Sequence, residues 1–366
     1  MASLYDLDRA PLGDLLADEP RYRVDQLWHG LYDEARPLEQ VTTVPRALRE
    51  RLADQFPVGL RLRAEVHSDR GATRKWVFAL PDDATIETVL MLYRDRVTVC
   101  VSSQAGCAMG CSFCATGQAG FTRHLSVGEI VEQVLVAARL AAPRRLSNVV
   151  FMGMGEPLAN YAATVGALRR LHEALHLGAR HLTVSTVGVI PALERLAGEG
   201  LPLTLAVSLH AANDALRDQL VPLNRRYPLE RLHAACRHWT EATGRRLSLE
   251  WALIQDVNDT PETIDELADF ARPLRAHVNL IPLNPTPGYP VRGSAPEQVR
   301  AVRDQLERRG VNATVRDTRG RSIAAACGQL AAVTRGRRRL AVRAGVPEGG
   351  APARQQERPE DAGQPA

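Results

Sequence analysis

A short apolar strand runs directly into a cysteine-rich loop in the segment Val97-Thr-Val-Cys100-Val-Ser-Ser-Gln104-Ala-Gly-Cys107-Ala-Met-Gly-Cys111-Ser-Phe-Cys114. The β-branched residues at its start predict a strand over 97–103. In βα barrels, loops that follow the carboxyl ends of strands carry the functional side chains. The segment therefore predicts a strand of a parallel sheet followed by a functional loop.

From residue 97 onward, short apolar segments alternate with helical stretches. Such repeated βα units indicate a parallel sheet covered by helices. Six or seven units, with no Gly-x-Gly-x-x-Gly after a strand, favour a barrel over an open dinucleotide-binding sheet. We expect an α/β fold with a partial (β/α)6-type barrel over 97–335. The predicted strands are 97–103, 147–152, 181–186, 203–209, 247–254, 277–282 and 311–316, and the predicted helices are 126–141, 161–176, 190–198, 228–243, 261–271, 295–309 and 321–333.

Three further segments flank the barrel. Residues 1–56 show helical spacing of apolar side chains and predict a small helical domain. Residues 57–96 alternate apolar and polar side chains and predict an antiparallel connector. Residues 336–366 are rich in Arg, Ala, Gly, Pro, Gln and Glu, and predict a disordered tail.

The composition indicates a globular protein: of 366 residues, 45% are hydrophobic and 24% are charged. No apolar run approaches the ~18 residues of a transmembrane helix. The N-terminus lacks a basic region and a long apolar stretch, which argues against a signal peptide. Six cysteines in this length do not make a secreted disulfide scaffold. We therefore expect a cytoplasmic protein without a membrane partner.

Charge is unevenly distributed along the chain, whose formal net charge is +4. Residues 1–60 hold seven arginines and 11 acidic residues, whereas residues 291–343 hold 13 arginines and four acidic residues. The basic end suits an anionic partner such as RNA, although a solvated basic surface has the same composition. Lys75 is the single lysine among 46 basic residues.

Cys107, Cys111 and Cys114 form a Cys-x3-Cys-x2-Cys string. Three thiolates can hold three irons of a 4Fe–4S cluster and leave the fourth iron open. A closed zinc site is the alternative, with His124 as the fourth ligand. A role as buried core thiols is a poor explanation for three cysteines within eight residues.

Polar residues end several other predicted strands. Taken singly, each is as easily a turn former or a helix cap, but their common placement predicts that they face one cavity. Glycines there allow close backbone approach, and the carboxylate of Glu156 can receive an ammonium group. The other cysteines, Cys100, Cys236 and Cys327, resemble buried core thiols in their local sequence. The strand-end residues are Gly153, Gly155, Glu156, Ser185, Ser208, Leu209, His210 and Asn284.

The cysteine string, with Phe113 before its last cysteine, resembles the radical S-adenosylmethionine (SAM) superfamily. The resemblance becomes narrower when more motifs are included, and the sequence from about residue 85 to 335 resembles the RlmN/Cfr family of RNA methyltransferases. The motifs are CVSSQ before GCxxxCxFC, then MGMGEP, STxGVIP, SLHA, PLNP and RxTRGxxIxAACGQL. The helical N-terminus resembles the RNA-binding accessory domain of the RlmN branch.

The resemblance implies the activity. The RlmN branch methylates carbon 2 of one adenosine in 23S rRNA, and in some members carbon 2 of the adenosine beside the tRNA anticodon. The Cfr branch methylates carbon 8 instead. The implied substrate is naked or partly assembled 23S rRNA together with tRNA, and flavodoxin or ferredoxin is the implied type of electron donor. A monomer would suffice. A noncatalytic, metal-stabilised RNA-binding protein is the rival from another class.

The resemblance also assigns residues. Cys107, Cys111 and Cys114 would hold one 4Fe–4S cluster, and two SAM molecules would be used per turnover. Cys327 would carry the methyl group, Cys100 would be its disulfide partner, and Glu87 would accept the ring proton. The local sequence of Glu87, taken without the resemblance, instead suggests an outward charge on a half-exposed strand. Arg316, Arg319 and Arg321 would bind phosphates or be surface charges. Gly155, Glu156, Ser185, Ser208, Leu209, His210 and Asn284 would line the SAM site.

Overall fold

The computed structural model describes residues 3–57, 59–286, 288–317 and 319–330. The predicted tail at 336–366 lies outside these ranges. In the described part of the chain, no helix has both the length and the apolar character needed to cross a membrane.

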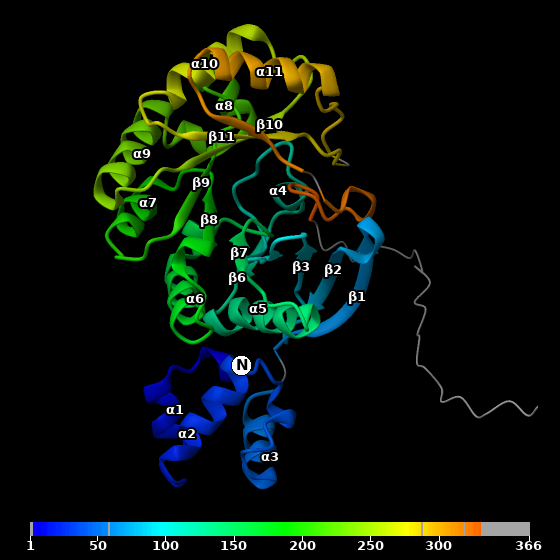
Figure 1. The fold of residues 1–366 in the computed structure, drawn as a ribbon, viewed down its shortest axis with the longest axis vertical. Coiled ribbons are helices and arrows are strands. Elements are labelled where there is room, and N and C mark those ends of the chain that lie inside the picture. The colour runs from blue at the N-terminus through cyan, green and yellow to red at the C-terminus, as the bar shows by residue number, and fades with distance from the viewer. Residues whose placement is uncertain (1–2, 58, 287, 318, 331–366) are drawn as a thin grey trace, which may run out of the picture. The chain divides into compact units, whose positions relative to one another are not determined.

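A ten-stranded sheet forms the centre of the fold (Figure 1), and β5 and β6 form a separate two-stranded antiparallel sheet. Its strands follow the order β1-β2-β3-β4-β7-β8-β9-β10-β11-β12, and all neighbours from β4 to β12 are parallel. Within the described residues, the outer strands β1 and β12 do not pair with each other. The α/β fold with a partial barrel is therefore confirmed. The strands are β1 (Arg61–Ser68), β2 (Thr73–Ala79), β3 (Thr85–Leu92), β4 (Val97–Cys100), β5 (Gln104–Gly106), β6 (Phe121–His124), β7 (Asn148–Phe151), β8 (Leu182–Thr186), β9 (Thr204–Ser208), β10 (Ser248–Leu253), β11 (His277–Pro282) and β12 (Ala313–Val315).

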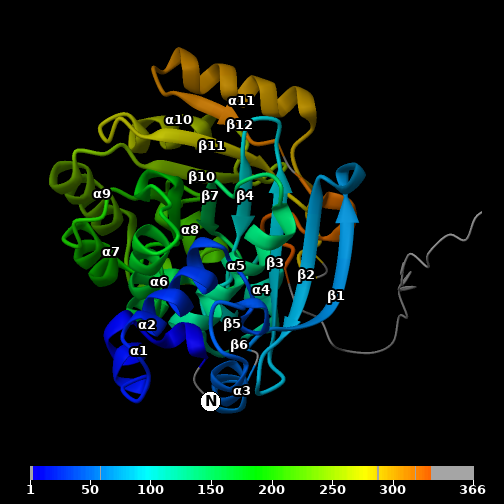
Figure 2. The ribbon, with the colours of Figure 1, turned by 60° about the horizontal axis from the view of Figure 1, so that its bottom comes forward.

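Helices lie along the outer side of the curved sheet (Figures 1 and 2). Their apolar faces are buried, as in α5, where Ile130, Val131 and Val134 are fully covered. A capping box at Ser126 and Glu129 begins α5 and satisfies its first amides. The helices are α1 (Arg9–Leu15), α2 (Tyr22–Trp28), α3 (Arg46–Gln55), α4 (Ala115–Ala119), α5 (Val127–Ala141), α6 (Tyr161–Glu173), α7 (Ile190–Ala197), α8 (Asp214–Leu220), α9 (Leu229–Thr243), α10 (Pro261–Ala271) and α11 (Pro296–Arg308), with short 3-10 turns that include η1 (Leu4–Asp6), η4 (Asp69–Gly71) and η8 (Arg321–Ile323).

The antiparallel strands β1, β2 and β3 extend the barrel sheet through the pairing of β3 with β4. In that register Cys100 lies opposite Val89, and Lys75 of β2 lies opposite Val89 on the other side. Residues opposite each other in an antiparallel pair point to the same face, and so do residues two apart along a strand. Lys75, Glu87, Val89 and Cys100 therefore share one face of the sheet.

Two predicted elements are wrong in part. The strand predicted at 97–103 ends at Cys100, because the amide of Ser102 donates to Gln133 Oε1 on α5 and leaves the ladder. The helix predicted at 321–333 is, within the described residues, only the turn η8 followed by irregular chain. Left-handed backbone at Ala324 (φ 49°) and Gly328 (φ 83°) ends any helix there. Helices α4 and α8 were not predicted.

Arg170 of α6 joins the N-terminal helical segment to the barrel. Its guanidinium is buried and donates to the carbonyls of Tyr5 (3.1 Å) and Leu7 (2.9 Å) and to the hydroxyl of Tyr32 (2.6 Å). It also pairs with Asp8. The neighbouring Arg169 lies at the surface and pairs with Glu199. One buried cation therefore satisfies several polar groups of the segment before α3.

Arg170→Met should lower the free energy of unfolding by about 2–4 kcal/mol, because it leaves buried carbonyls without donors. Arg169→Met is the matched control, and a surface ion pair predicts a loss of at most about 1 kcal/mol. Urea unfolding of both variants measures the difference. Equal effects of the two substitutions would show that Arg170 does not carry this contact.

Candidate active site

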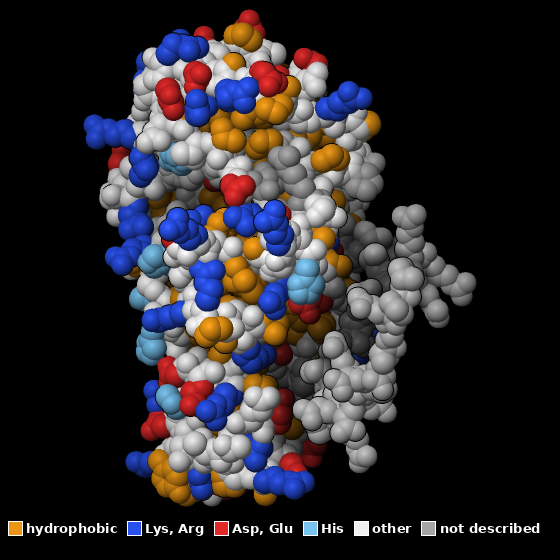
Figure 3. Space-filling model, turned by 45° about the vertical axis from the view of Figure 1, so that its right-hand side comes forward, with side chains coloured by type: hydrophobic (Ala, Val, Ile, Leu, Met, Phe, Trp, Pro, Cys, Tyr) orange, Lys and Arg blue, Asp and Glu red, His pale blue; other side chains and the backbone are white. Residues whose placement is uncertain are grey.

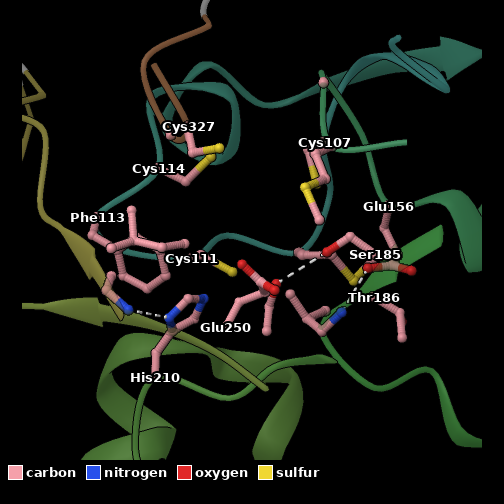
Figure 4. Close-up of a pocket in the computed structure, with 18 of the residues that line it drawn as sticks. Cys107, Cys111, Phe113, Cys114, Glu156, Ser185, Thr186, His210, Glu250 and Cys327 are labelled. Atoms are coloured by element: carbon pink, nitrogen blue, oxygen red, sulfur yellow. Dashed lines mark hydrogen bonds between the residues drawn. The ribbon is translucent and has the colours of Figure 1, made fainter. Parts of the chain in front are cut away.

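A cavity of about 150 Å³ opens at the carboxyl ends of the parallel strands (Figure 4). Figure 4 shows Cys107, Cys114 and Cys327 on one side of the cavity, with His210 and Glu250 on the other. The site residues predicted from the sequence that line it are Cys107, Cys111, Cys114, Gly155, Glu156, Ser185, Ser208, His210, Asn284 and Cys327. Three predicted site residues, Glu87, Cys100 and Leu209, lie outside its lining.

Backbone contacts shape the three-cysteine loop. The amide of Cys107 donates to Gly120 O (2.8 Å), and the amide of Cys114 donates to Cys111 O (3.1 Å). Gly106 has φ 79°, and a Cβ built there would lie 2.1 Å from Gly120 O. The hairpin of β5 and β6 thus needs glycine at 106, and it delivers Cys107 to the cavity.

The thiols of the loop suit a cationic partner. Burial raises the pKa of Cys107 to about 12. Burial, followed by the neighbouring thiols of Cys114 and Cys107, raises the pKa of Cys111 as well. Thiolates at these positions therefore need nearby positive charge, which iron ions provide. Three thiols on one cavity fit a 4Fe–4S cluster with one open iron.

The alternative zinc site finds no fourth ligand in His124. His124 Nδ1 lies 3.0 Å from Gln104 Nε2, and its ring packs edge-on against Phe121, away from the cavity lining. In the described part of the chain, no three His, Cys, Asp or Glu side chains are grouped so that they could share one metal ion, as a zinc site requires, whereas a 4Fe–4S cluster takes one thiolate per iron.

Glu156 is fixed by the backbone around it. Its carboxylate accepts from the amides of Leu158 (3.0 Å) and Val187 (2.9 Å), and its own amide donates to Gln104 Oε1 (2.8 Å). Burial raises the pKa of Glu156 to about 7. A cationic ligand group beside this carboxylate would favour its ionised form. The geometry therefore agrees with a site for an ammonium group.

His210 is held as a neutral ring. Its Nδ1 accepts from the amide of Ala252 (3.0 Å), and Phe113 packs edge-on against it at 4.7 Å. Burial, together with the nearby Arg217, lowers the pKa of His210 to about 3. With Nδ1 as acceptor, Nε2 carries the proton. The Leu209 side chain is buried and lies outside the cavity lining.

A second, smaller cavity of about 30 Å³ adjoins the first and shares Cys327, Asn284 and Arg316 with it. Cys100 lies on this smaller cavity, and both cysteines are free thiols. Burial, then the neighbouring Cys327, raises the pKa of Cys100 to about 12. Asn284 Nδ2 donates to Cys327 O (3.3 Å). Cys327 therefore faces both the three-cysteine loop and Cys100.

Glu87 lies on β3 and is buried, in contrast to the outward charge that its local sequence suggests. Its carboxylate lies 3.2 Å from Lys75 Nζ. Cys236 is fully buried on α9, as expected of a core thiol.

The predicted phosphate-binding arginines have different surroundings. Arg316 contacts Glu250 at 3.7 Å, and the charge of Cys327 is the largest influence that raises the pKa of Arg316. Arg319 stacks over Tyr93 at 4.8 Å and pairs with Asp317. The Arg321 side chain lies outside the described residues.

Sequence reasoning missed two charged residues of the site. Glu250 lines the cavity and accepts from Ser248 Oγ (2.9 Å) and Asn279 Nδ2 (2.7 Å). A charge inside the apolar strand 247–254 was a usable signal for it. Arg217 of α8 is almost fully buried and has no such signal, because it lies in a short polar helix.

Arg217 ties together the loops that follow β8 and β9. It donates to the carbonyls of Val187 (2.8 Å), Ser208 (3.3 Å) and Leu209 (3.1 Å). The same Val187 donates its amide to Glu156. Arg217 therefore positions Glu156 and Ser208 indirectly, through backbone.

Comparison with known proteins agrees with this geometry. The radical SAM superfamily model matches residues 101–271. A probable dual-specificity RNA methyltransferase RlmN of Parafrankia sp. (strain EAN1pec) is 53% identical over 351 residues, which span 88% of this chain and 91% of the relative. The protein of the same name from Frankia casuarinae is 54% identical and covers 91% of this chain and 83% of its own length. The chain belongs to the RlmN family of radical SAM enzymes.

A crystal structure of a radical SAM methyltransferase from Sphaerobacter thermophilus supports the same assignment. It is 50% identical, matches with a TM-score of 0.89, and covers 91% of this chain and all of that one. Membership of the radical SAM superfamily implies an iron–sulfur cluster and SAM, which fits the three thiols and the cavity beside them.

Arg217→Met should raise the Kd for SAM by about ten-fold or more, about 1.4 kcal/mol, because the loops that hold Glu156 and Ser208 lose their shared donor. Equilibrium dialysis with the anaerobically reconstituted protein measures this. Arg225→Met, an exposed arginine five residues beyond α8, is the control and should leave Kd unchanged within two-fold. Unchanged binding by the Arg217 variant would contradict the positioning role.

Proposed function

We propose that this protein methylates carbon 2 of an adenosine in 23S rRNA and of the adenosine 3′ of the anticodon in tRNAs. The observation that carries the proposal is that Cys327 lies on both cavities, one lined by the three-cysteine loop and one by Cys100. The names of the relatives, dual-specificity RNA methyltransferases, support RNA as the substrate. A cytoplasmic monomer with a flavodoxin or ferredoxin as electron donor fits this activity.

Carbon 2 of adenine has no nucleophilic lone pair, so it cannot displace the methyl group of SAM directly. In the proposed assignment Cys107, Cys111 and Cys114 hold the cluster, and Glu156, Ser185, Ser208, His210 and Asn284 surround SAM. When bound, the cluster and SAM supply the radical chemistry that activates a methyl group for addition to the ring. Cys327 carries that methyl group, because a thiolate is a good nucleophile for an ordinary displacement on SAM.

Cys100 would release the product by forming a disulfide with Cys327. The structure offers a physical reason for its reactivity in this step. Burial keeps Cys100 protonated, whereas the guanidinium of Arg316 acts in the opposite direction on its pKa. The charges of both cysteines in turn raise the pKa of Arg316. Arg316 therefore favours the thiolate of Cys100, which is the species that attacks.

RNA binding is supported by charge. Basic side chains extend from one end to the other of the face in Figure 3, with hydrophobic patches between them. Arg316 and Arg319 line the cavity next to Cys100 and Cys327. Phosphate contacts by such arginines would position a base that is unstacked for reaction.

Deletion and restoration of the gene test the proposed reaction. Digested 23S rRNA and tRNA from the deletion strain should lack 2-methyladenosine, and both should regain it when the gene is restored, as measured by mass spectrometry. Recovery of 8-methyladenosine instead would assign carbon 8, as in the Cfr branch. A colourless protein after anaerobic purification, with no new methyladenosine, would favour the noncatalytic RNA-binding protein.

Cysteine substitutions test the division of labour. Cys327→Ala should abolish methylation of the protein by SAM, whereas Cys100→Ala should still load the methyl group and accumulate a protein–RNA crosslink. Intact-protein mass spectrometry and denaturing gels measure the two products. Cys236→Ala is the control, because that thiol is buried in α9. It should neither abolish methyl loading nor accumulate a protein–RNA crosslink. Normal turnover by Cys100→Ala would refute the scheme.

A further inference from the structure

The single lysine of the chain is buried in the sheet that supports the candidate site. Lys75 lies on β2, with only 10% of its side chain exposed. Every other basic residue of the chain except histidine is arginine. The chain therefore uses lysine at one position only, in a place where solvation does not explain a charged side chain.

Lys75 makes two contacts from this position. Its Nζ lies 3.2 Å from Glu87 Oε2, and it donates to Ala324 O at 3.1 Å. The Glu87 side chain is 5% exposed. Ala324 precedes Cys327 by three residues, in the irregular segment after η8. One ammonium group therefore contacts both the candidate proton acceptor and the segment that carries the candidate methyl carrier.

Stability alone does not account for the pair. Removing two charges from water costs several kcal/mol per ion, and an apolar pair of similar volume often does as well or better. An arginine would place a planar group with five donors where two acceptors are found, whereas an ammonium is compact and has three donors. The residue types at 75 and 87 therefore fit a requirement for a charged carboxylate.

The register of the sheet directs this pair toward the smaller cavity. Glu87, Val89 and Met91 alternate along β3 and so share a face, and Val89 and Met91 line that cavity with Cys100 and Cys327. Figure 1 shows the chain after β12 lying beside β1 and β2.

We propose that Lys75 is a positioning residue for Glu87. Its ammonium keeps the Glu87 carboxylate ionised and oriented toward the smaller cavity. This inference rests on the proposed function, in which Glu87 accepts the ring proton. Removing Lys75 takes away a positive charge that lies 3.2 Å from the buried Glu87 carboxylate, and this loss favours the protonated carboxyl, which cannot act as a base.

Two other contacts anchor the same segment without touching Glu87, and they provide a matched control. Gly320 donates its amide to Asp69 Oδ2 (3.1 Å), and Ser322 Oγ lies 2.7 Å from Ser68 Oγ. Asp69→Ala removes this anchor, together with an acceptor for Thr73 Oγ1, and alters neither the Lys75 nor the Glu87 side chain. A role of Lys75 in anchoring alone predicts that Lys75→Met and Asp69→Ala behave alike.

The test is a step-resolved assay of the reconstituted enzyme with a 23S rRNA fragment. Lys75→Met should load the methyl group on Cys327 within about two-fold of the wild type but form 2-methyladenosine about 10–100-fold more slowly, because proton removal is impaired. With adenosine deuterated at carbon 2, the isotope effect on product formation by Lys75→Met should exceed that of the wild type. Asp69→Ala should change loading and product in parallel, with the wild-type isotope effect.

Two further variants test whether the charge of Lys75 matters and whether it acts through Glu87. Lys75→Arg should recover part of the rate, because it keeps a cation beside Glu87. Combining Lys75→Met with Glu87→Gln should slow product formation no further than Glu87→Gln alone, since both remove the same function. Thermal unfolding confirms that each variant is folded. If Lys75→Met does not fold, the same assay of loading, product and isotope effect is made with Lys75→Arg.

Two results would overturn the proposal with the proposed function intact. One is a loss of product in Lys75→Met that merely follows its loss of methyl loading, as in Asp69→Ala. The other is a wild-type isotope effect in Lys75→Met, which would exclude slower proton removal as the cause of its lost activity. A wild-type enzyme that forms no methyladenosine would instead refute the proposed function, and this inference with it.

Discussion

Parallel pairing of the strands from β4 to β12 is the constraint on which the site depends. Because all of these strands run the same way, the segments that follow them meet at one edge of the sheet. The three cysteines lie beyond β4, after the short strand β5 of the separate two-stranded sheet. Together with Glu156 after β7 and His210 after β9 they line one cavity, although these segments are distant in sequence. The antiparallel extension through β3 then adds a second wall, which carries Glu87 and pairs with β4 at Cys100.

Within this frame, buried polar and charged side chains are held by hydrogen bonds to the backbone rather than by solvent. Arg217 binds three carbonyls, Glu156 accepts two amides, and His210 accepts one. In a poorly polarisable interior such bonds are strong, and a group left unpaired is costly. The site is therefore organised by the protein before any ligand enters. Preorganised groups of this kind need little rearrangement during a reaction.

Much of this arrangement could be predicted from the sequence, because its signals are local. Apolar periodicity located the barrel units, and the cysteine spacing and strand-end motifs located most residues of the main cavity. Arg217 and Lys75 were not identified as parts of the site, because each acts through contacts with segments far away in the sequence, and neither lies in a recognisable motif. The burial of Glu87 was likewise hidden, since the local sequence does not reveal that both faces of β3 will be buried.

The segment at 321–333 shows why local pattern failed where function is concentrated. Its alanines and leucine favour a helix, but a helix over these residues would bond its own amides and carbonyls. The observed chain gives them to other partners: Gly328 O accepts from Ala115, and Ala324 O accepts from Lys75. These distant bonds keep Cys327 between two cavities, in contact with two different chemical environments. Irregular backbone is thus the structure that a residue serving two partners requires, and tertiary contacts override helix propensity to provide it.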